Sequence, residues 1–295
     1  MSKFKSLALV FLSYVVCIAV GAYIGLALIP EQPIIVVAIA DLIATLVIFA
    51  FSFGFRNSSI YDPYWSVIPI VIALYWMWES GSTLVVENAQ RQWLVLGLIT
   101  FWGCRLTYNW ARGWSGLGQE DWRYRDLAER HGRSYWLVSL TGIHLLPTLL
   151  VFLGMVPVYF AMNSAASLQF WDYLGASIAI GGTLVEAVAD EQLRTYRRDP
   201  NRATPFLSTG LWKYSRHPNY FGEISFWVGL FIVGASVAPD RILLVGLGSI
   251  SMILLFVFIS IPMIDKRMIA SKQGYEEHCR RVSALIPWFP RTSQQ

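Results

Sequence analysis

Long apolar segments recur along this chain and constrain its fold more than any other feature. The first runs from Leu7 to Ile29, and a second runs from about Ile34 to Phe55. A helix needs about 20 apolar residues to span a bilayer, and both segments reach that length. The first is too long for the core of a signal peptide, so we expect it to be retained. Only helices and closed barrels satisfy the backbone within lipid, and segments of this kind predict membrane helices.

Later apolar segments repeat the pattern between polar loops. Hydrophobic residues make up 55% of the chain and charged residues only 14%, whereas about a quarter of a soluble domain is charged. We therefore predict an all-α, polytopic membrane helix bundle of about 8 transmembrane helices. Beyond the first two, helices are expected at residues 64–78, 92–111, 136–162, 171–198, 218–235 and 242–264.

The positive charges are distributed unevenly between the two sides of the predicted bundle. With the amino terminus in the cytoplasm, only Arg91 and Arg241 of the 23 Lys and Arg residues fall on the far side. This asymmetry follows the positive-inside rule and predicts that both termini are cytoplasmic. The net charge of +4 thus reflects topology and predicts no nucleic-acid partner. We expect an integral protein of a bacterial inner membrane or the endoplasmic reticulum, with its oligomeric state left open.

Residues 210–223, GLWKYSRHPNYFGE, are the densest run of polar, basic and aromatic side chains. They precede an apolar segment, and Pro218 suits the first turn of the helix expected there. Free backbone N–H groups in that turn, together with nearby cations such as Arg216, predict an anion pocket. Asn219 and Glu223 lie four residues apart and hence on one helix face.

A second charged pattern lies on the helix expected at residues 171–198. Glu186, Asp190, Arg194 and Arg197 follow at spacings of four, four and three, which places them on one stripe. Charges within membrane helices are costly, so each needs a partner or a function. One interpretation is a self-neutralising ladder that only packs the bundle. The like charges of Glu186 and Asp190 argue instead for a binding site.

Residues 210–223 carry a resemblance to a known family. The string resembles the signature of the steroid 5-alpha-reductase-like membrane proteins, in particular their DUF1295 branch. The loop GWSGLG at residues 113–118 and the closing segment near residues 265–290 are similar to that branch as well. The resemblance implies a seven-helix reductase-like core with the cofactor site in residues 91–295. Residues 1–90 would supply additional helices within one integral membrane domain of residues 1–295.

The resemblance also implies an activity and a cofactor. It predicts an NADPH-dependent oxidoreductase acting on a CH–CH group, which saturates the conjugated double bond of a steroid-like or other lipid-soluble enone. It matches Asp190, Arg194 and Arg197 to a cofactor ladder, and Asn219 and Glu223 to contacts with the nicotinamide end. The full set of expected cofactor residues, on the cytoplasmic side, is Asp190, Arg194, Arg197, Tyr214, Arg216, His217, Asn219, Glu223, Arg123 and Arg267.

Reduction of an enone also requires a group that stabilises the developing oxyanion. The resembling reductases use a Tyr–Glu pair from their early helices. In this chain, Tyr108 is the candidate for the tyrosine and Asp62 the candidate for the acid. Arg123 belongs to the loop at residues 113–125, which is expected to form a lid over the cofactor or a helix on the membrane surface.

Two other function classes remain open. The shorter core Arg-His-Pro-x-Tyr-x-Gly is shared with membrane methyltransferases of the isoprenylcysteine carboxyl methyltransferase kind. The alternative is therefore an S-adenosylmethionine-dependent methyltransferase of a lipid or prenylated thiol. A lipid-binding or assembly factor without activity is the third class. The sequence contains no P-loop or zinc motif, and we expect no metal.

Overall fold

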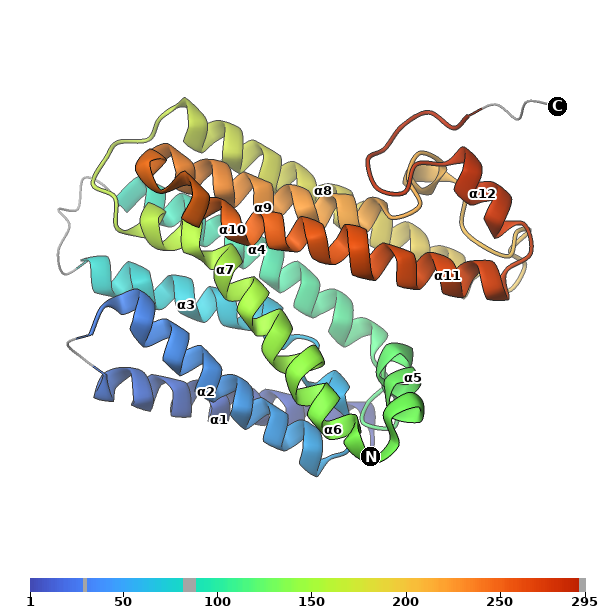
Figure 1. Cartoon of the computed structure of the whole chain (residues 1–295), viewed down its shortest axis with the longest axis horizontal. Coiled ribbons are helices and arrows are strands. Elements are labelled where there is room, and N and C mark those ends of the chain that lie inside the picture. Colours follow the sequence, from blue (N-terminus) through green and yellow to red (C-terminus); the bar gives the residue numbers. More distant parts are fainter. Residues whose placement is uncertain (29–30, 82–88, 292–295) are drawn as a thin grey trace. The chain divides into compact units, whose positions relative to one another are not determined.

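Helices form all the regular structure in the part of the chain that is described. The computed structural model describes residues 1–28, 31–81 and 89–291 (Figure 1). No β-strand occurs within these ranges, and the all-α prediction is confirmed. The first two expected helices are separated by a turn at residues 30–33, and the third and fourth by a polar loop at residues 79–91. Parts of both connections lie outside the described residues.

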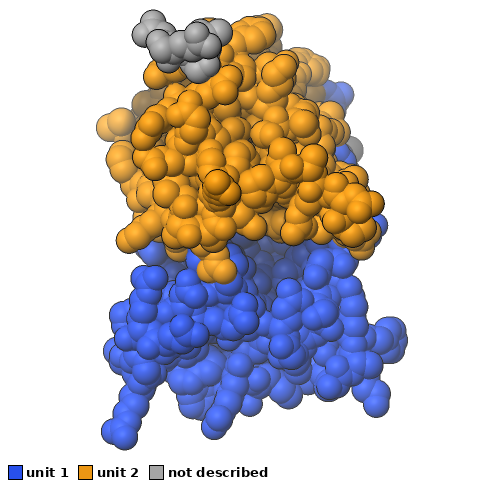
Figure 2. All heavy atoms as spheres, turned by 90° about the vertical axis from the view of Figure 1, so that its right-hand side faces the viewer, with its two compact units in different colours: residues 1–167 blue, residues 168–295 orange. Residues whose placement is uncertain are grey.

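The chain divides into two compact units, residues 1–167 and residues 168–295, which Figure 2 colours separately. The expected reductase-like core of residues 91–295 includes parts of both units. Helix α4 (Ala89–Gly113) packs within unit 1 against α3 (Tyr64–Gly81). The two helices approach so closely at Gly103 that an added Cβ atom would collide with the Ser66 carbonyl oxygen.

Unit 1 begins with two long apolar helices, α1 (Lys3–Ala27) and α2 (Pro33–Gly54), which pack against each other. Pro33 occupies the first turn of α2, where its missing N–H costs no hydrogen bond. The later part of the unit contains α5 (Trp122–His131), α6 (Tyr135–Val138), a π-helical turn (Ser139–Leu145) and α7 (Leu146–Met162).

Unit 2 is organised around the contact between α8 (Phe170–Arg198) and α9 (Pro218–Val237) (Figure 1). Glycines on both helices allow the two backbones to approach, as is common between membrane helices. Pro218 is the first residue of α9, as predicted. The remaining helices are α10 (Ile242–Leu255), a π-helical turn (Phe256–Ser260), α11 (Ile261–Ser271) and α12 (Tyr275–Arg281).

Five helical stretches in the described part of the chain are long and apolar enough to cross a membrane. The protein is therefore an integral, polytopic membrane protein with an all-helical fold. With α3, α4 and α8 the expected count of eight membrane helices would be complete. These three carry more polar or aromatic side chains than the five stretches, so their crossing of the membrane stays a prediction. The five stretches are Lys3–Ala27, Pro33–Gly54, Trp122–Met162, Pro218–Val237 and Pro239–Ser271.

Candidate functional site

The charged stripe of α8 runs from a buried carboxylate to exposed guanidinium groups. Glu186 is buried, Asp190 and Arg194 are partly exposed, and Arg197 is exposed. Arg194 and Arg197 form no ion pair with any residue in the described ranges. Their positive charges are therefore available to an anionic ligand, since guanidinium groups bind phosphate well.

The first turns of α9 bring two expected cofactor residues to this stripe. Asn219 donates from Nδ2 to Oδ1 of Asp190 at 3.4 Å. The Oδ1 atom of Asn219 is buried and accepts no hydrogen bond from the residues that the structure describes. Leaving a buried amide oxygen without a donor costs about 1–3 kcal/mol. This oxygen marks a place where a bound molecule can supply an N–H or O–H group.

Glu223 lies one turn after Asn219 on the same helix. It is only 2% exposed, and its Oε1 accepts a hydrogen bond from Nε1 of Trp227 at 2.8 Å. A buried carboxylate requires several hydrogen-bond donors, and the Trp227 indole is one of them. The structure thus joins Asn219 to Asp190 and Glu223 to Trp227.

Asp265 on α11 holds two of the expected phosphate-binding residues. Its Oδ2 lies 3.0 Å from Nη1 of Arg216, and its Oδ1 lies 3.0 Å from Nε2 of His217. The hydroxyl of Tyr275 also donates to this Oδ1 at 3.0 Å. An anionic ligand would have to compete with Asp265 for Arg216. Asp265 was not among the expected site residues, although its position just before two basic residues was a usable signal.

The last two expected cofactor residues of unit 2 lie near the carboxy-terminal segment. The ring of Tyr214 meets that of Phe289 edge-on, with 5.9 Å between their centroids. The Tyr214 carbonyl oxygen also accepts a hydrogen bond from the Trp288 backbone N–H at 2.9 Å. Arg267 is an exposed residue of α11. These contacts tie Tyr214 to the folded tail.

In unit 1, the glycine-rich loop expected to act as a lid is held by hydrogen bonds to Asn57 and Ser58. The Asn57 side-chain amide donates to the carbonyl oxygens of Leu117 and Gln119, at 2.9 and 3.0 Å. Oε1 of Glu120 accepts from the Ser58 backbone N–H at 2.7 Å. Burial raises the pKa of Glu120, although this hydrogen bond opposes the shift. The contacts hold the loop in place and are those of a structural element.

Arg123, which was expected within this loop, lies in the first turn of α5 and is bound by the residue that caps this helix. Its Nε and Nη2 donate to the two carboxylate oxygens of Asp121 at 2.8 and 3.0 Å. The bidentate pair lowers the pKa of Asp121 even though burial acts in the opposite direction. Arg123 belongs to unit 1, whereas the other expected cofactor residues belong to unit 2.

The two expected catalytic residues have different partners in the structure. Tyr108 is 65% exposed, and the Arg112 guanidinium lies over its ring at 5.3 Å from the centroid. Asp62 is partly buried and accepts at Oδ1 from the Tyr124 hydroxyl at 2.6 Å. Burial raises the pKa of Asp62 to about 7, against the opposing charge of Arg123. Asp62 is therefore paired with Tyr124 rather than with Tyr108.

A buried tyrosine–carboxyl pair exists elsewhere in unit 1, between α2 and α3. The Tyr64 hydroxyl donates to Oδ1 of Asp41 at 2.8 Å, and their side chains belong to residues only 1% and 6% exposed. Thr45 donates to the same hydroxyl at 3.3 Å and lies 2.9 Å from the Thr148 hydroxyl. Asp41 is a charged residue within the second apolar segment of the sequence, but the sequence does not reveal its partner.

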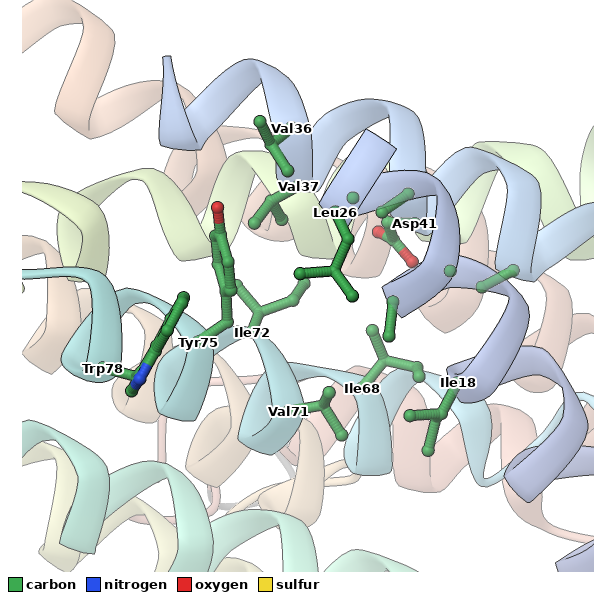
Figure 3. A pocket seen from close by; sticks show the side chains of 15 residues that line it. Ile18, Leu26, Val36, Val37, Asp41, Ile68, Val71, Ile72, Tyr75 and Trp78 are labelled. Carbon is green, nitrogen blue, oxygen red and sulfur yellow. The ribbon is translucent and has the colours of Figure 1, made fainter. Parts of the chain in front are cut away.

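Asp41 lies in the wall of an apolar pocket (Figure 3). The pocket has a volume of about 240 Å³ and is lined by residues from α1, α2 and α3. Figure 3 places Tyr75 and Trp78 toward one end and Asp41 toward the other. A pocket with mostly apolar walls and a few placed polar groups is the usual form of a small-molecule site.

Comparison with known proteins matches residues 48–282 to a family described as "Protein of unknown function (DUF1295)". The chain belongs to the DUF1295 family. An uncharacterized protein from Schizosaccharomyces pombe is 27% identical over 237 residues, which cover 72% of this chain and 67% of the yeast protein. No solved structure matches the chain.

The DUF1295 match includes most of the site residues described above. It covers Tyr64 and all of α8 and α9, with the stripe and Asn219. Asp41 and helix α1 precede the matched residues. The carboxyl half of the tyrosine–carboxyl pair thus lies outside the part of the chain on which family membership rests.

Proposed function

We propose that this protein is a membrane-embedded reductase that uses NADPH to saturate a carbon–carbon double bond conjugated to a carbonyl group in a lipid-soluble substrate. The observation that carries the proposal is the buried hydrogen bond between Asp41 and Tyr64 in the wall of an apolar pocket. A reductase of this class requires an O–H donor against the substrate carbonyl, in a site that water does not fill.

In this proposal Asp41 and Tyr64 take the roles first given to Asp62 and Tyr108. The Asp41 carboxyl, carrying its proton, donates to the carbonyl oxygen and stabilises the enolate that forms. Tyr64 holds Oδ1 of that carboxyl and fixes its direction, while Thr45 in turn donates to Tyr64. A bound NADPH would supply the hydride for the β-carbon, and uptake of a proton at the α-carbon would complete the reduction.

Unit 2 offers residues that fit the dinucleotide. The guanidinium groups of Arg194 and Arg197 would hold phosphate, and the extra phosphate of NADPH suits more than one free cation. The buried Oδ1 of Asn219 fits the N–H₂ group of the nicotinamide carboxamide. Glu223, on the same face, would accept from the same carboxamide. The asymmetry of Lys and Arg supports a cytoplasmic location for this site.

The experiment uses the full-length protein in detergent, with NADPH deuterated at its transferable position and a lipid-soluble enone. We expect NADPH oxidation that depends on the enone and deuterium at the β-carbon of the product. Asp41→Asn should lower the rate by about a hundredfold or more, as is usual for loss of an acid catalyst. Asp240→Asn is the matched control, since the Asp240 side chain is 77% exposed and outside the pocket.

Two results would contradict the proposal. If Asp41→Asn reduces the enone at the wild-type rate, as the control Asp240→Asn should, then Asp41 is not the acid that donates to the substrate carbonyl. If the protein binds S-adenosylmethionine and does not bind NADPH, the methyltransferase alternative is favoured. Titration calorimetry with both cofactors distinguishes these cases independently of turnover.

A further inference from the structure

The shape of the pocket in unit 1 limits which lipid it can take. The helices α1, α2 and α3 line it side by side, and each contributes residues over two to three turns. On α3 the lining runs from Ile68 to Trp78, which corresponds to a length of about 15 Å along the helix axis. The lining of α1 runs from Ile18 to Leu26, or about 12 Å. The pocket is thus a groove that follows the helix axes.

The groove is narrow for its length. The volume of about 240 Å³ extends along that length, and an extended hydrocarbon chain suits such an elongated shape. Its floor is formed by small residues, among them Gly21 and Gly25 of α1 and Ala40 of α2. At Gly21 an added Cβ atom would lie 3.2 Å from the Ala40 carbonyl oxygen, so the helices are already close there.

The ends of the groove differ in chemistry. Toward one end lies Asp41, the sole ionisable carboxyl among its lining residues. Oδ1 of Asp41 accepts from Tyr64, and Oδ2 makes no hydrogen bond with the residues that the structure describes. Toward the other end lie the rings of Tyr75 and Trp78 (Figure 3). A ligand would therefore place one polar group at Asp41 and lay its apolar part along the groove.

We infer that the groove binds an acyclic, single-chain lipid whose terminal carbonyl group hydrogen-bonds to Asp41, with the chain extending toward Trp78. This inference rests on the proposed function, because the carbonyl is that of the enone to be reduced. It names the substrate class of that site as acyl- or prenyl-chain enones, in preference to fused-ring steroids.

The test uses a long-chain acyclic enone that carries a diazirine at the end remote from its carbonyl. Full-length protein in detergent is irradiated with this probe, and the labelled peptides are mapped by mass spectrometry. We expect the label near Tyr75 and Trp78, at the end of the groove away from Asp41. Excess unlabelled acyclic enone should compete, and an excess of a steroid enone should not.

A pair of variants separates the groove from general contact with lipid. Ala22→Phe fills the groove, and we expect it to reduce labelling about tenfold, the equivalent of about 1.4 kcal/mol. Ala50→Phe adds the same ring to an exposed position of α2 outside the groove and should leave labelling unchanged. Equal labelling of both variants, label spread along the lipid-exposed faces, or displacement by the steroid enone would each overturn the inference.

The two proposals fail in different ways. Labelling confined to the groove without any NADPH oxidation would overturn the reductase proposal and leave the chain-like ligand intact. Reduction of a steroid enone without labelling of the groove by the acyclic probe would overturn the chain-like ligand and leave the reductase proposal intact.

Discussion

Gly182 of α8 and Gly222 of α9 lie so close that a Cβ atom built on either would fall 2.5 Å from the carbonyl oxygen of the other. Real Cβ atoms do not tolerate such a contact with backbone, so both positions require glycine as long as the helices keep this separation. The stripe residues Glu186 and Asp190 follow Gly182 within about two turns of α8. The glycine contact thus sets how near α9 comes to the candidate cofactor site.

Gly182→Ala should destabilise the protein for this reason. Overpacking costs about 1–3 kcal/mol, which exceeds the roughly 1 kcal/mol that alanine gains over glycine in helix propensity. We expect a melting temperature several degrees lower in detergent, measured by tryptophan fluorescence. Gly181→Ala is the neighbouring control, because a Cβ atom at Gly181 meets no other atom within 4 Å. Equal melting temperatures for the two variants would contradict the packing seen here.

Asp62 should make stability depend on pH. Its pKa in the folded protein is raised to about 7, whereas an aspartate in an unfolded chain titrates near 4. The folded state therefore holds its proton more tightly. The resulting stability is fully present below about pH 4 and is lost as pH rises toward about 7.

Asp62→Asn removes this contribution while keeping an oxygen that can accept from Tyr124. We expect the wild-type melting temperature to fall, relative to that of Asp62→Asn, as pH rises through this range. Asp240→Asn should follow the wild-type curve, since Asp240 is exposed. Parallel curves for wild type and Asp62→Asn would show that the proton on Asp62 is not held more tightly in the folded state.

Glu223→Gln tests the nicotinamide end of the proposed cofactor site. Glutamine keeps an oxygen for the Trp227 indole N–H but replaces one acceptor with a donor. We expect NADPH affinity to fall by about 1–3 kcal/mol, the usual cost of an unmatched buried hydrogen bond. The melting temperature should change little. Calorimetric titration and thermal unfolding measure the two quantities.

The matched control for Glu223→Gln is Glu277→Gln, on a side chain of α12 that is 55% exposed. It should change neither quantity. A purely structural role for Glu223 predicts the opposite pattern, in which Glu223→Gln unfolds several degrees earlier and binds NADPH with wild-type affinity.

The amino terminus should lie in the cytoplasm, because the basic residues are concentrated on that side of the predicted helices. With Cys17, Cys104 and Cys279 replaced, Ser2→Cys should resist a membrane-impermeant maleimide in intact cells and react after lysis. A cysteine at Asp240, in the expected outer loop, should react before lysis. Labelling of Ser2→Cys in intact cells would reverse this topology.

The helices of this protein are predictable from local sequence. Apolar segments of sufficient length, a proline at the first position of α9 and the polar loops between them are sufficient to place the helices within a few residues. A spacing of four residues likewise places Glu186, Asp190 and Arg194 on one stripe, because that spacing is a property of a single helix.

Pairings between helices were not predictable in this way. Asp41 stands out as a charge in an apolar segment. Its partner Tyr64, however, lies beyond a loop and is the first residue of α3. Likewise, nothing local assigns Asp265 to Arg216 and His217, which then have less charge available for a ligand.

The sequence by itself thus determined a polytopic helical membrane protein of the DUF1295 type and the helix face on which each charged residue lies. Only the tertiary structure decided that Asp41 is paired with Tyr64, that Asp62 is paired with Tyr124, and that a groove lies beside the first of these pairs. The physical reason is that a residue's helix face follows from backbone periodicity, whereas its partner depends on the rotation and separation of packed helices. In this protein, small residues set that separation: Gly21 of α1 lies close to Ala40 of α2, and Gly182 of α8 lies close to Gly222 of α9.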